Sequence, residues 1–141
     1  YGCQIVRPET DFDDPDDPVK MNHLIEMLGA ENVDYRMKTA CCGASLMGTQ
    51  EELAMRLCKN LLLDAERKGA HCLVTTCPLC QMNLDVYQGK VNKLFKTKFN
   101  LPVLYFTQLI GIALGMPPEK LGLGRLAVKL TKPIREIFQG A

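Results

Sequence analysis

Residues 71–80 read His-Cys-Leu-Val-Thr-Thr-Cys-Pro-Leu-Cys, and this stretch decides the fold class. Its first part, residues 71–76, is rich in apolar and β-branched residues, which is typical of a buried strand. Its second part is a Cys-x-x-Cys motif with Pro78 where a helix would start, and proline costs no hydrogen bond at a first helical position. The stretch therefore predicts a strand that ends directly at a cysteine pair and a helix.

The pattern continues downstream of this stretch. Helical spacing predicts one long amphipathic helix after the Cys-x-x-Cys motif, with apolar positions at Leu84, Tyr87, Val91, Leu94 and Phe95. Leu101-Pro102 then introduces an apolar strand over residues 103–106, followed by Thr107 as a candidate helix cap and a short helix over residues 108–115. Two strands joined through a helix predict a parallel pair.

Upstream, two more helices are expected. Asp17 is a candidate cap for a first helix that starts near Pro18 and ends at Gly29, and a short strand over residues 33–37 follows it. Residues 49–52, Thr-Gln-Glu-Glu, form a capping-box signature for a second helix that ends at Gly69. Residues 1–3 have the pattern of the end of another strand.

Together these elements predict an α/β fold: a mainly parallel, open sheet of about four strands with flanking helices, and a cysteine site at the C-terminal ends of the strands. We expect residues 1–116 to form the cysteine-rich domain. Residues 117–141, in which basic residues are frequent, are expected to form a C-terminal extension that is partly helical or flexible.

Composition narrows the class of protein. The chain has 141 residues and a formal net charge of +1, which fits one domain and gives no basic footprint for nucleic acid. The longest apolar stretch, residues 101–116, is interrupted by Pro102, Thr107 and Gln108, so no membrane span is expected. No export signal is recognisable, and we expect a cytoplasmic location.

Seven cysteines are present, an odd number that does not suit an evenly paired disulfide scaffold. Five of them lie in three groups, each next to an expected strand end: Cys3, Cys41 with Cys42, and Cys77 with Cys80. Because neighbouring strands lie about 5 Å apart, the three groups could meet at one centre. Gly43 would permit the bend at the tandem pair, and the helix N-terminus after Cys77 would favour thiolates there.

At these residues the sequence resembles the cysteine-rich CCG domain, of which the B subunit of heterodisulfide reductase carries two copies. The similarity rests on five motifs and is greatest to the second copy, the C-terminal half of that protein: Tyr1-Gly2-Cys3-Gln4, Asp14-Pro15, Cys41-Cys42-Gly43, Cys77-Pro78-x-Cys80-x-x-Asn83-Leu84 and Tyr105-Phe106-Thr107-Gln108-Leu109. The resemblance implies that five cysteines hold a non-cubane 4Fe-4S cluster: Cys3, Cys41, Cys42, Cys77 and Cys80.

The same resemblance implies a function and partners. It suggests an oxidoreductase that acts on a disulfide or thiol substrate, with an iron-sulfur electron-transfer subunit and a flavin subunit as partners. Because one domain is recognisable where the family has two, the chain alone is not expected to be a complete catalyst.

Three other interpretations stay open. The cysteines could hold structural zinc that serves assembly, or the motif could belong to a subunit of a quinone-linked dehydrogenase complex. Cys77-Pro78-Leu79-Cys80 alone could be a thioredoxin-like dithiol, although that leaves Cys3, Cys41 and Cys42 without a role.

The remaining candidate residues are expected to have structural roles. Cys58 and Cys72 are expected in the core, and His23 and His71 at the surface or in packing positions. A last group flanks the cluster loop, where its members would either donate hydrogen bonds to sulfur or cap the helix: Thr76, Gln81 and Asn83.

Overall fold

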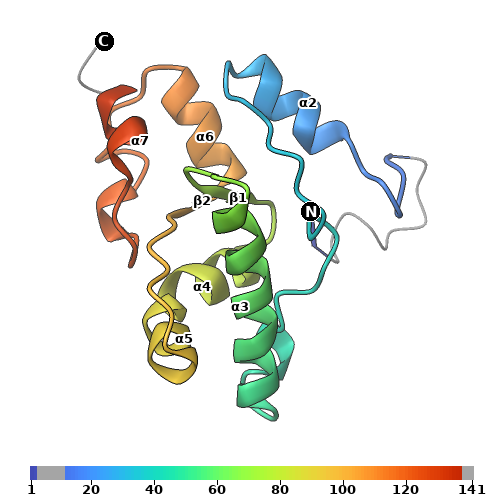
Figure 1. The fold of residues 1–141 in the computed structure, drawn as a ribbon. Helices are drawn as coiled ribbons and strands as arrows, with labels where there is room; N and C mark the ends of the chain where they lie inside the picture. The colour runs from blue at the N-terminus through green and yellow to red at the C-terminus, as the bar shows by residue number, and fades with distance from the viewer. Residues whose placement is uncertain (3–11, 138–141) are drawn as a thin grey trace.

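The computed structural model describes residues 1–2 and 12–137, and its centre is a small parallel sheet (Figure 1). Strand β1 (Leu73–Thr75) pairs in parallel with β2 (Val103–Tyr105), with Leu73 opposite Val103. Both strands are largely buried, which agrees with their continuous apolar sequence. The prediction of a strand leading into the Cys-x-x-Cys helix is confirmed, as is the parallel pairing.

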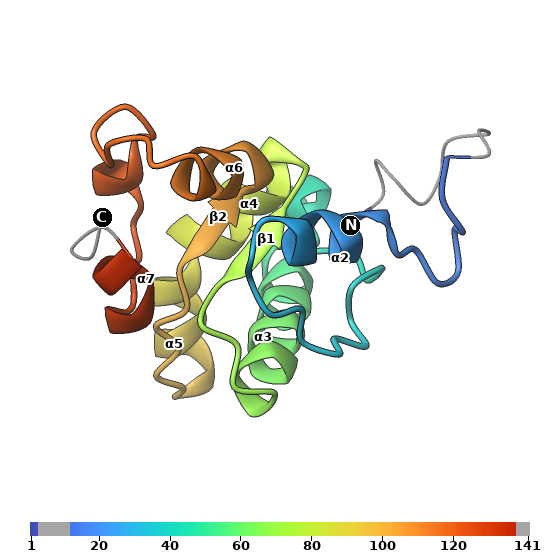
Figure 2. The same ribbon diagram turned by 90° about the horizontal axis from the view of Figure 1, so that it is seen from above.

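Helices surround these strands, with α2 on one flank and α7 on the other (Figures 1 and 2). In chain order the helical elements are α2 (Lys20–Met27), the 3-10 helix η1 (Ala44–Leu46), α3 (Glu51–Arg67), α4 (Pro78–Val86), α5 (Gln88–Phe95), α6 (Phe106–Ala113), the 3-10 helix η2 (Leu123–Arg125) and α7 (Lys132–Ile137).

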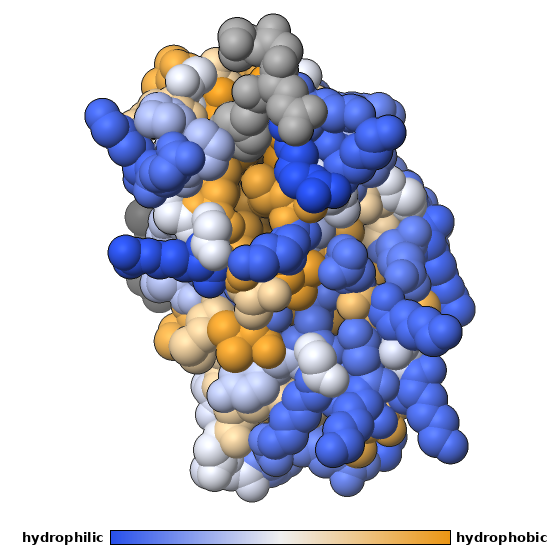
Figure 3. Space-filling model, turned by 90° about the vertical axis from the view of Figure 1, so that its left-hand side faces the viewer, coloured by the Kyte–Doolittle hydropathy of each residue, from blue (hydrophilic) through white to orange (hydrophobic). Residues whose placement is uncertain are grey.

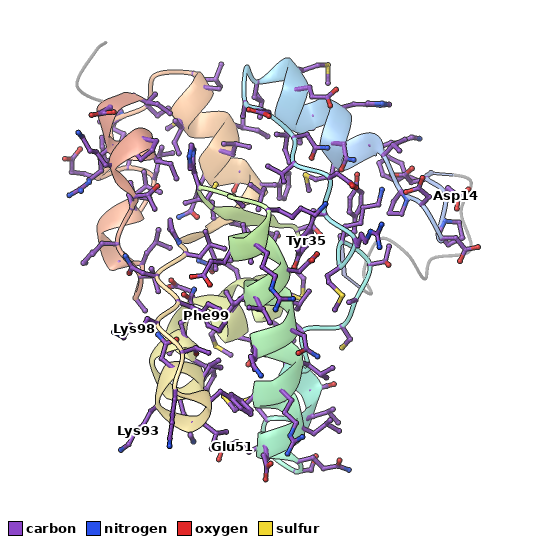
Figure 4. The ribbon with its side chains drawn as sticks, in the orientation of Figure 1. Asp14, Tyr35, Glu51, Lys93, Lys98 and Phe99 are labelled. Atoms are coloured by element: carbon purple, nitrogen blue, oxygen red, sulfur yellow. The ribbon has the colours of Figure 1, made fainter. Side chains whose placement is uncertain are left out.

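The prediction of about four strands is wrong for the described residues, which contain two. The expected strand at residues 33–37 is instead an irregular segment whose backbone bonds are local, as in the bond from the Lys38 amide to the Tyr35 carbonyl at 3.2 Å. Residues of this segment and of β1 both line a cavity of about 640 Å³, and among the described residues β1 pairs only with β2. Tyr35 instead reaches α3, where its hydroxyl donates to the Leu61 carbonyl at 3.0 Å (Figure 4). Cys3, at the end of the other expected strand, lies outside the described residues.

The single long helix expected after Cys80 is interrupted at Tyr87 and forms α4 and α5. Gln88 explains the break. Its side-chain amide donates to the Leu84 carbonyl at 2.9 Å, in place of a backbone bond of a continuous helix, and to the Leu101 carbonyl at 2.6 Å. Its oxygen accepts from the Leu101 amide at 3.1 Å, so this buried residue joins the helix pair to the segment that returns to β2 past Phe99 (Figure 4).

The residues that cap α2, α3 and α6 differ from the sequence prediction. The Asp13 carboxylate, not that of Asp17, accepts from the Val19 and Lys20 amides at the start of α2. The capping box at residues 49–52 does not form, because the turn after η1 runs directly into α3 and its N-cap, Gln50, makes no side-chain cap bond.

At α6 the Gln108 side chain, and not Thr107, supplies the cap, accepting from the Tyr105 amide at 2.8 Å. The predicted end of α3 is correct: Gly69 has a φ of 72°, and residues 69 and 70 donate back to Glu66 and Ala65.

The core has two parts. The larger part lies between α3, α4, α5 and the strands, and it includes Cys42, Cys77 and Cys80. The smaller part joins β2 and α6 to the C-terminal segment through Leu104, Ile112, Leu123, Leu126 and Ile134.

The C-terminal segment is anchored beside the larger core. The buried Asp85 carboxylate on α4 accepts from the Ala127 and Val128 amides at 2.8 and 3.0 Å. On the face that carries α7, hydrophobic residues lie between hydrophilic ones (Figure 3). Residues 121–137 are thus bound to the same body as the cysteine helix.

Candidate metal centre

The turn from β1 into α4 places two cysteines in the interior. Cys77 is the N-cap of α4 with an extended backbone, Pro78 takes the first helical position, and the Gln81 amide closes the first turn on the Cys77 carbonyl at 3.0 Å. Cys77 and Cys80 are 6% and 9% exposed, so both sulfurs belong to the core and not to the surface. The helix N-terminus favours negative charge at this position.

The tandem cysteines come from the loop before η1. Gly43 has a φ of 78°, and a Cβ at this residue would lie 3.0 Å from Ala54 Cα and from Leu57 Cδ1 of α3. A glycine is therefore needed both for the backbone conformation and for the close approach to α3. This packing buries Cys42 at 4% exposure and leaves Cys41 exposed, its sulfur accepting from the Gly43 amide at 3.3 Å.

Cys42 and Cys80 meet sulfur to sulfur. Their Sγ atoms lie 3.1 Å apart and are joined by a hydrogen bond, although the residues are 38 positions apart in sequence. The hydrogen bond between the two thiols lowers the pKa of Cys42 to about 6. The same contact, together with burial and the neighbouring Cys77, raises the pKa of Cys80. The contact between the two sulfurs therefore favours the loss of one proton from the pair and the retention of the other.

The first two residues of the chain lie against this pair. The Thr76 hydroxyl donates to the Tyr1 carbonyl at 3.2 Å, and the Tyr1 hydroxyl donates to Asn22 Oδ1 at 2.8 Å. Gly2 has a φ of 62°, and a Cβ at Gly2 would lie 3.5 Å from Cys80 Sγ. The chain thus passes close to the Cys80 sulfur immediately before Cys3.

A small crevice of about 50 Å³ opens at this meeting point, and its lining includes Tyr1, Gly2, Thr75 and the cysteines Cys42, Cys77 and Cys80. Thr75 Oγ1 is buried and has no hydrogen-bond partner among the described residues.

The Cys42 and Cys80 sulfurs lie closer together than two ligands of one metal ion. Two thiolates on one tetrahedral metal stand about 3.8 Å apart, worked from a metal–sulfur bond of about 2.3 Å. The described pair is closer than that at 3.1 Å, and in the described part of the chain no three His, Cys, Asp or Glu side chains are arranged to hold a single ion. The chemistry of the crevice fits a thiolate-bound group, because it offers buried sulfurs and a hydroxyl without a partner among the described residues. To bind one metal, the Cys42 and Cys80 sulfurs would move apart from 3.1 Å to about 3.8 Å.

The predicted site residues thus divide into three groups. Cys42, Cys77 and Cys80 lie together, Cys41 is adjacent but faces outward, and Cys3 lies outside the described residues. The six described cysteines are free thiols. His23 and His71 are exposed, as expected for surface histidines.

The two cysteines outside the predicted set are protonated at neutral pH. Cys58 is completely buried, and burial raises its pKa to about 12. Cys72 packs at the edge of the smaller core, and burial raises its pKa to about 11. Neither thiol lines the crevice.

Sequence reasoning missed one part of the site. Asn83 is fully buried, and its amide nitrogen donates to the Cys42 carbonyl at 2.8 Å and to Cys58 Sγ at 3.0 Å. Asn83 was expected either to donate to sulfur at the cluster loop or to cap the helix; the sulfur that its side-chain nitrogen contacts at 3.0 Å is that of Cys58, outside the predicted ligand set. The contact with the Cys42 carbonyl follows from the approach of the loop at residues 41–43 to α3 and α4, and the spacing of the motif carries no signal for it.

Comparison with known proteins places this geometry in context. The family model described as the CCG cysteine-rich domain matches residues 1–85. The 8-methylmenaquinol:fumarate reductase membrane anchor subunit of Wolinella succinogenes is 40% identical over 134 residues, which cover 94% of this chain and 47% of that protein. The B subunit of the ferredoxin:CoB-CoM heterodisulfide reductase of Methanosarcina mazei is 34% identical over 143 residues, covering 99% and 48%.

A third relative, from Archaeoglobus profundus, is named as a protein like the B subunit of heterodisulfide reductase. It is 34% identical over 125 residues, or 84% of this chain and 42% of that protein. The chain spans about half the length of the curated relatives it matches. Although one relative is named a membrane anchor, no helix among residues 12–137 combines the length and apolar character needed to cross a bilayer.

Proposed function

The chain belongs to the CCG cysteine-rich domain family, and on this basis we propose that it is the cluster-binding part of a subunit in a heterodisulfide reductase-like redox complex. The single observation that carries the proposal is the 3.1 Å contact between Cys42 and Cys80. Buried thiols of two separate segments meet there without forming a disulfide. Such an arrangement suits a shared inorganic group, because thiolates are its usual protein ligands.

The proposed ligands are Cys3, Cys41, Cys42, Cys77 and Cys80. Cys42, Cys77 and Cys80 line one crevice. Cys41 directly precedes Cys42, and its exposed sulfur is proposed as a ligand at the outer side of the crevice. Cys3 directly follows Gly2, which lines the same crevice as Cys80, and consecutive Cα atoms are about 3.8 Å apart. A set of five exceeds the four ligands of zinc or a simple cubane, which supports the non-cubane 4Fe-4S cluster implied by the family resemblance.

When bound, the cluster would supply electrons for the cleavage of a disulfide. Two electrons and two protons convert one disulfide into two thiols, and the electrons would come from an iron-sulfur partner subunit that a flavin subunit supplies. The chain's own residues would hold the group in a largely buried crevice, while Thr75 Oγ1, which has no partner among the described residues, could donate a hydrogen bond to sulfur.

Partners, location and completeness follow from the same proposal. A chain that spans about half the length of its relatives is proposed to act only as part of a larger oxidoreductase. Free thiols in all six described cysteines suit the reducing cytoplasm.

A second candidate function is favoured by one comparison. The relative with 40% identity is named as a subunit of an 8-methylmenaquinol:fumarate reductase. The same cysteine site could therefore belong to a quinone-linked complex, in which the group passes electrons and no disulfide is cleaved.

Anaerobic metal analysis tests the cluster proposal. The protein, reconstituted with iron and sulfide under reducing conditions, should bind both and exclude zinc, and Cys42→Ser should lose most of the bound iron. Cys72→Ser is the matched control, because Cys72 is a cysteine outside the crevice. Stoichiometric zinc without sulfide would favour the structural zinc alternative, and equal iron content in Cys42→Ser and the wild type would overturn the proposed ligand set.

Electron paramagnetic resonance separates the two candidate functions. A small thiol added to the oxidised, reconstituted protein should change the spectrum if a sulfur substrate reaches the cluster. A spectrum that responds to a quinone analogue and ignores the thiol would favour the quinone-linked candidate.

A further inference from the structure

Asn83 lies beneath the tandem cysteines and contacts two of the segments that build the site. Its amide nitrogen donates to the Cys42 carbonyl at 2.8 Å and to Cys58 Sγ at 3.0 Å. The Cys58 thiol donates to the same Cys42 carbonyl at 3.3 Å. Cys42, Cys58 and Asn83 therefore form a closed triangle between the loop before η1, helix α3 and helix α4.

The orientation of the Asn83 amide follows from these partners. A carbonyl oxygen only accepts hydrogen bonds, so the NH₂ group, and not the amide oxygen, must face Cys42. Both amide hydrogens are then used, one on the carbonyl and one on the Cys58 sulfur. Asn83 Oδ1 is left buried without a hydrogen-bond partner among the described residues.

Stability alone does not account for this residue. Burying an unpartnered amide oxygen is costly, and an apolar side chain of similar size would remove that cost. Gln88, the other fully buried amide on the same helix pair, is satisfied at both its nitrogen and its oxygen. Asn83 thus gives up one hydrogen bond while fixing the backbone of a cysteine whose sulfur faces Cys80.

We propose that Asn83, with Cys58 as its partner, is a positioning residue that fixes the Cys42 main chain so that the Cys42 sulfur faces the crevice. This inference rests on the proposed function, in which Cys42 is a ligand. Asn83 lies three positions after Cys80 on α4, so one helix carries a proposed ligand and the group that orients a second ligand from another loop. Such supporting contacts typically change metal affinity by about 10- to 100-fold.

The first test needs no metal. The ¹³C chemical shift of the Cys42 carbonyl, measured in the reduced, metal-free protein, reports the hydrogen bonds to that oxygen. Asn83→Leu should move this resonance upfield, because the carbonyl loses its shorter bond. Gln88→Met, which removes an equally buried amide elsewhere, should leave it unchanged.

Cys58→Ala provides a second variant if Asn83→Leu folds poorly. It deletes one of the two donors to the Cys42 carbonyl and leaves Asn83 in place. A smaller upfield shift is expected, and Cys58→Ser, whose hydroxyl can still donate, should restore part of it. No shift of the Cys42 carbonyl in Cys58→Ala and Asn83→Leu would overturn the inference.

The second test titrates the metal-free protein with Co²⁺ and follows the thiolate-to-metal charge-transfer band. Asn83→Leu should weaken binding by about 10- to 100-fold, while Gln88→Met binds like the wild type. Unchanged affinity in Asn83→Leu, beside a wild type that binds cobalt, would overturn the positioning role alone. A wild type without the band would overturn the metal-site proposal and the positioning role together.

Discussion

Replacing Gly43 with alanine should be among the most damaging small changes to this protein. Gly43 has a φ of 78°, and its missing Cβ would lie 3.0 Å from Ala54 Cα and Leu57 Cδ1. The left-handed conformation costs a non-glycine residue roughly 1–2 kcal/mol, and forcing an extra carbon into a packed core costs about 1–3 kcal/mol more. We therefore expect Gly43→Ala to lower the free energy of unfolding by about 2–5 kcal/mol.

Gly29 offers a matched control for the backbone cost. It has a φ of 80° at the end of α2, but a Cβ there would meet nothing within 4 Å. Gly29→Ala should therefore cost only the conformational part, about 1–2 kcal/mol. The difference between the two variants isolates the contact of the tandem-cysteine loop with α3.

Urea unfolding of the reduced, metal-free protein, followed by circular dichroism, measures both variants. Equal losses in Gly43→Ala and Gly29→Ala would refute the close packing of residues 41–43 on α3. A larger loss in Gly43→Ala, accompanied by weaker Co²⁺ binding, is the expected result, because the same packing sets the position of Cys42.

Two further predictions concern ionisation and the C-terminal segment. Folding lowers the pKa of Cys42 from 9.0 to about 6 and raises the pKa of Cys80. Between about pH 6 and pH 9 the folded pair therefore holds one proton fewer than the unfolded pair. Urea unfolding should show that the metal-free protein gains stability from about pH 6 to 9 and loses it above about pH 9, where Cys80 stays protonated only in the folded state; a flat profile would contradict the loss of one proton from the pair and the retention of the other. Asp85→Asn should cost about 2 kcal/mol and speed hydrogen exchange of the Ala127 and Val128 amides, since it weakens the buried acceptor of both; unchanged exchange would show that this contact does not anchor the segment.

Local chemistry made the strand–cysteine–helix unit predictable. Apolar residues before Cys77, proline at position 78 and helical spacing beyond it act within one short stretch, and β1 and α4 appear where expected. Gly69 likewise ends α3, because its positive φ serves the closing turn.

The errors in the fold prediction come from tertiary contacts. Residues 33–37 alternate like a strand, yet Tyr35 bonds to α3 and the segment does not pair with β1. The interruption at Tyr87 depends on Gln88 reaching Leu101 as well as Leu84, a contact that helical periodicity cannot show.

The candidate site was predictable only in part from the sequence. The spacing of the cysteines suggested that their loops converge, and Cys42, Cys77 and Cys80 do line one crevice. The outward position of Cys41 and the contact of Asn83 with the Cys42 carbonyl depend on how the loop packs against α3 and α4. That packing involves residues far apart in sequence, so it carries no local pattern.

The central claim is that Cys3, Cys41, Cys42, Cys77 and Cys80 hold one iron-sulfur group, and Cys3 is the most informative residue for testing it. Electron paramagnetic resonance of the anaerobically reconstituted, oxidised protein in the presence of thiol should give a signal that is altered or lost in Cys3→Ser and unchanged in Cys72→Ser. An identical signal in Cys3→Ser and the wild type would contradict the shared five-cysteine centre.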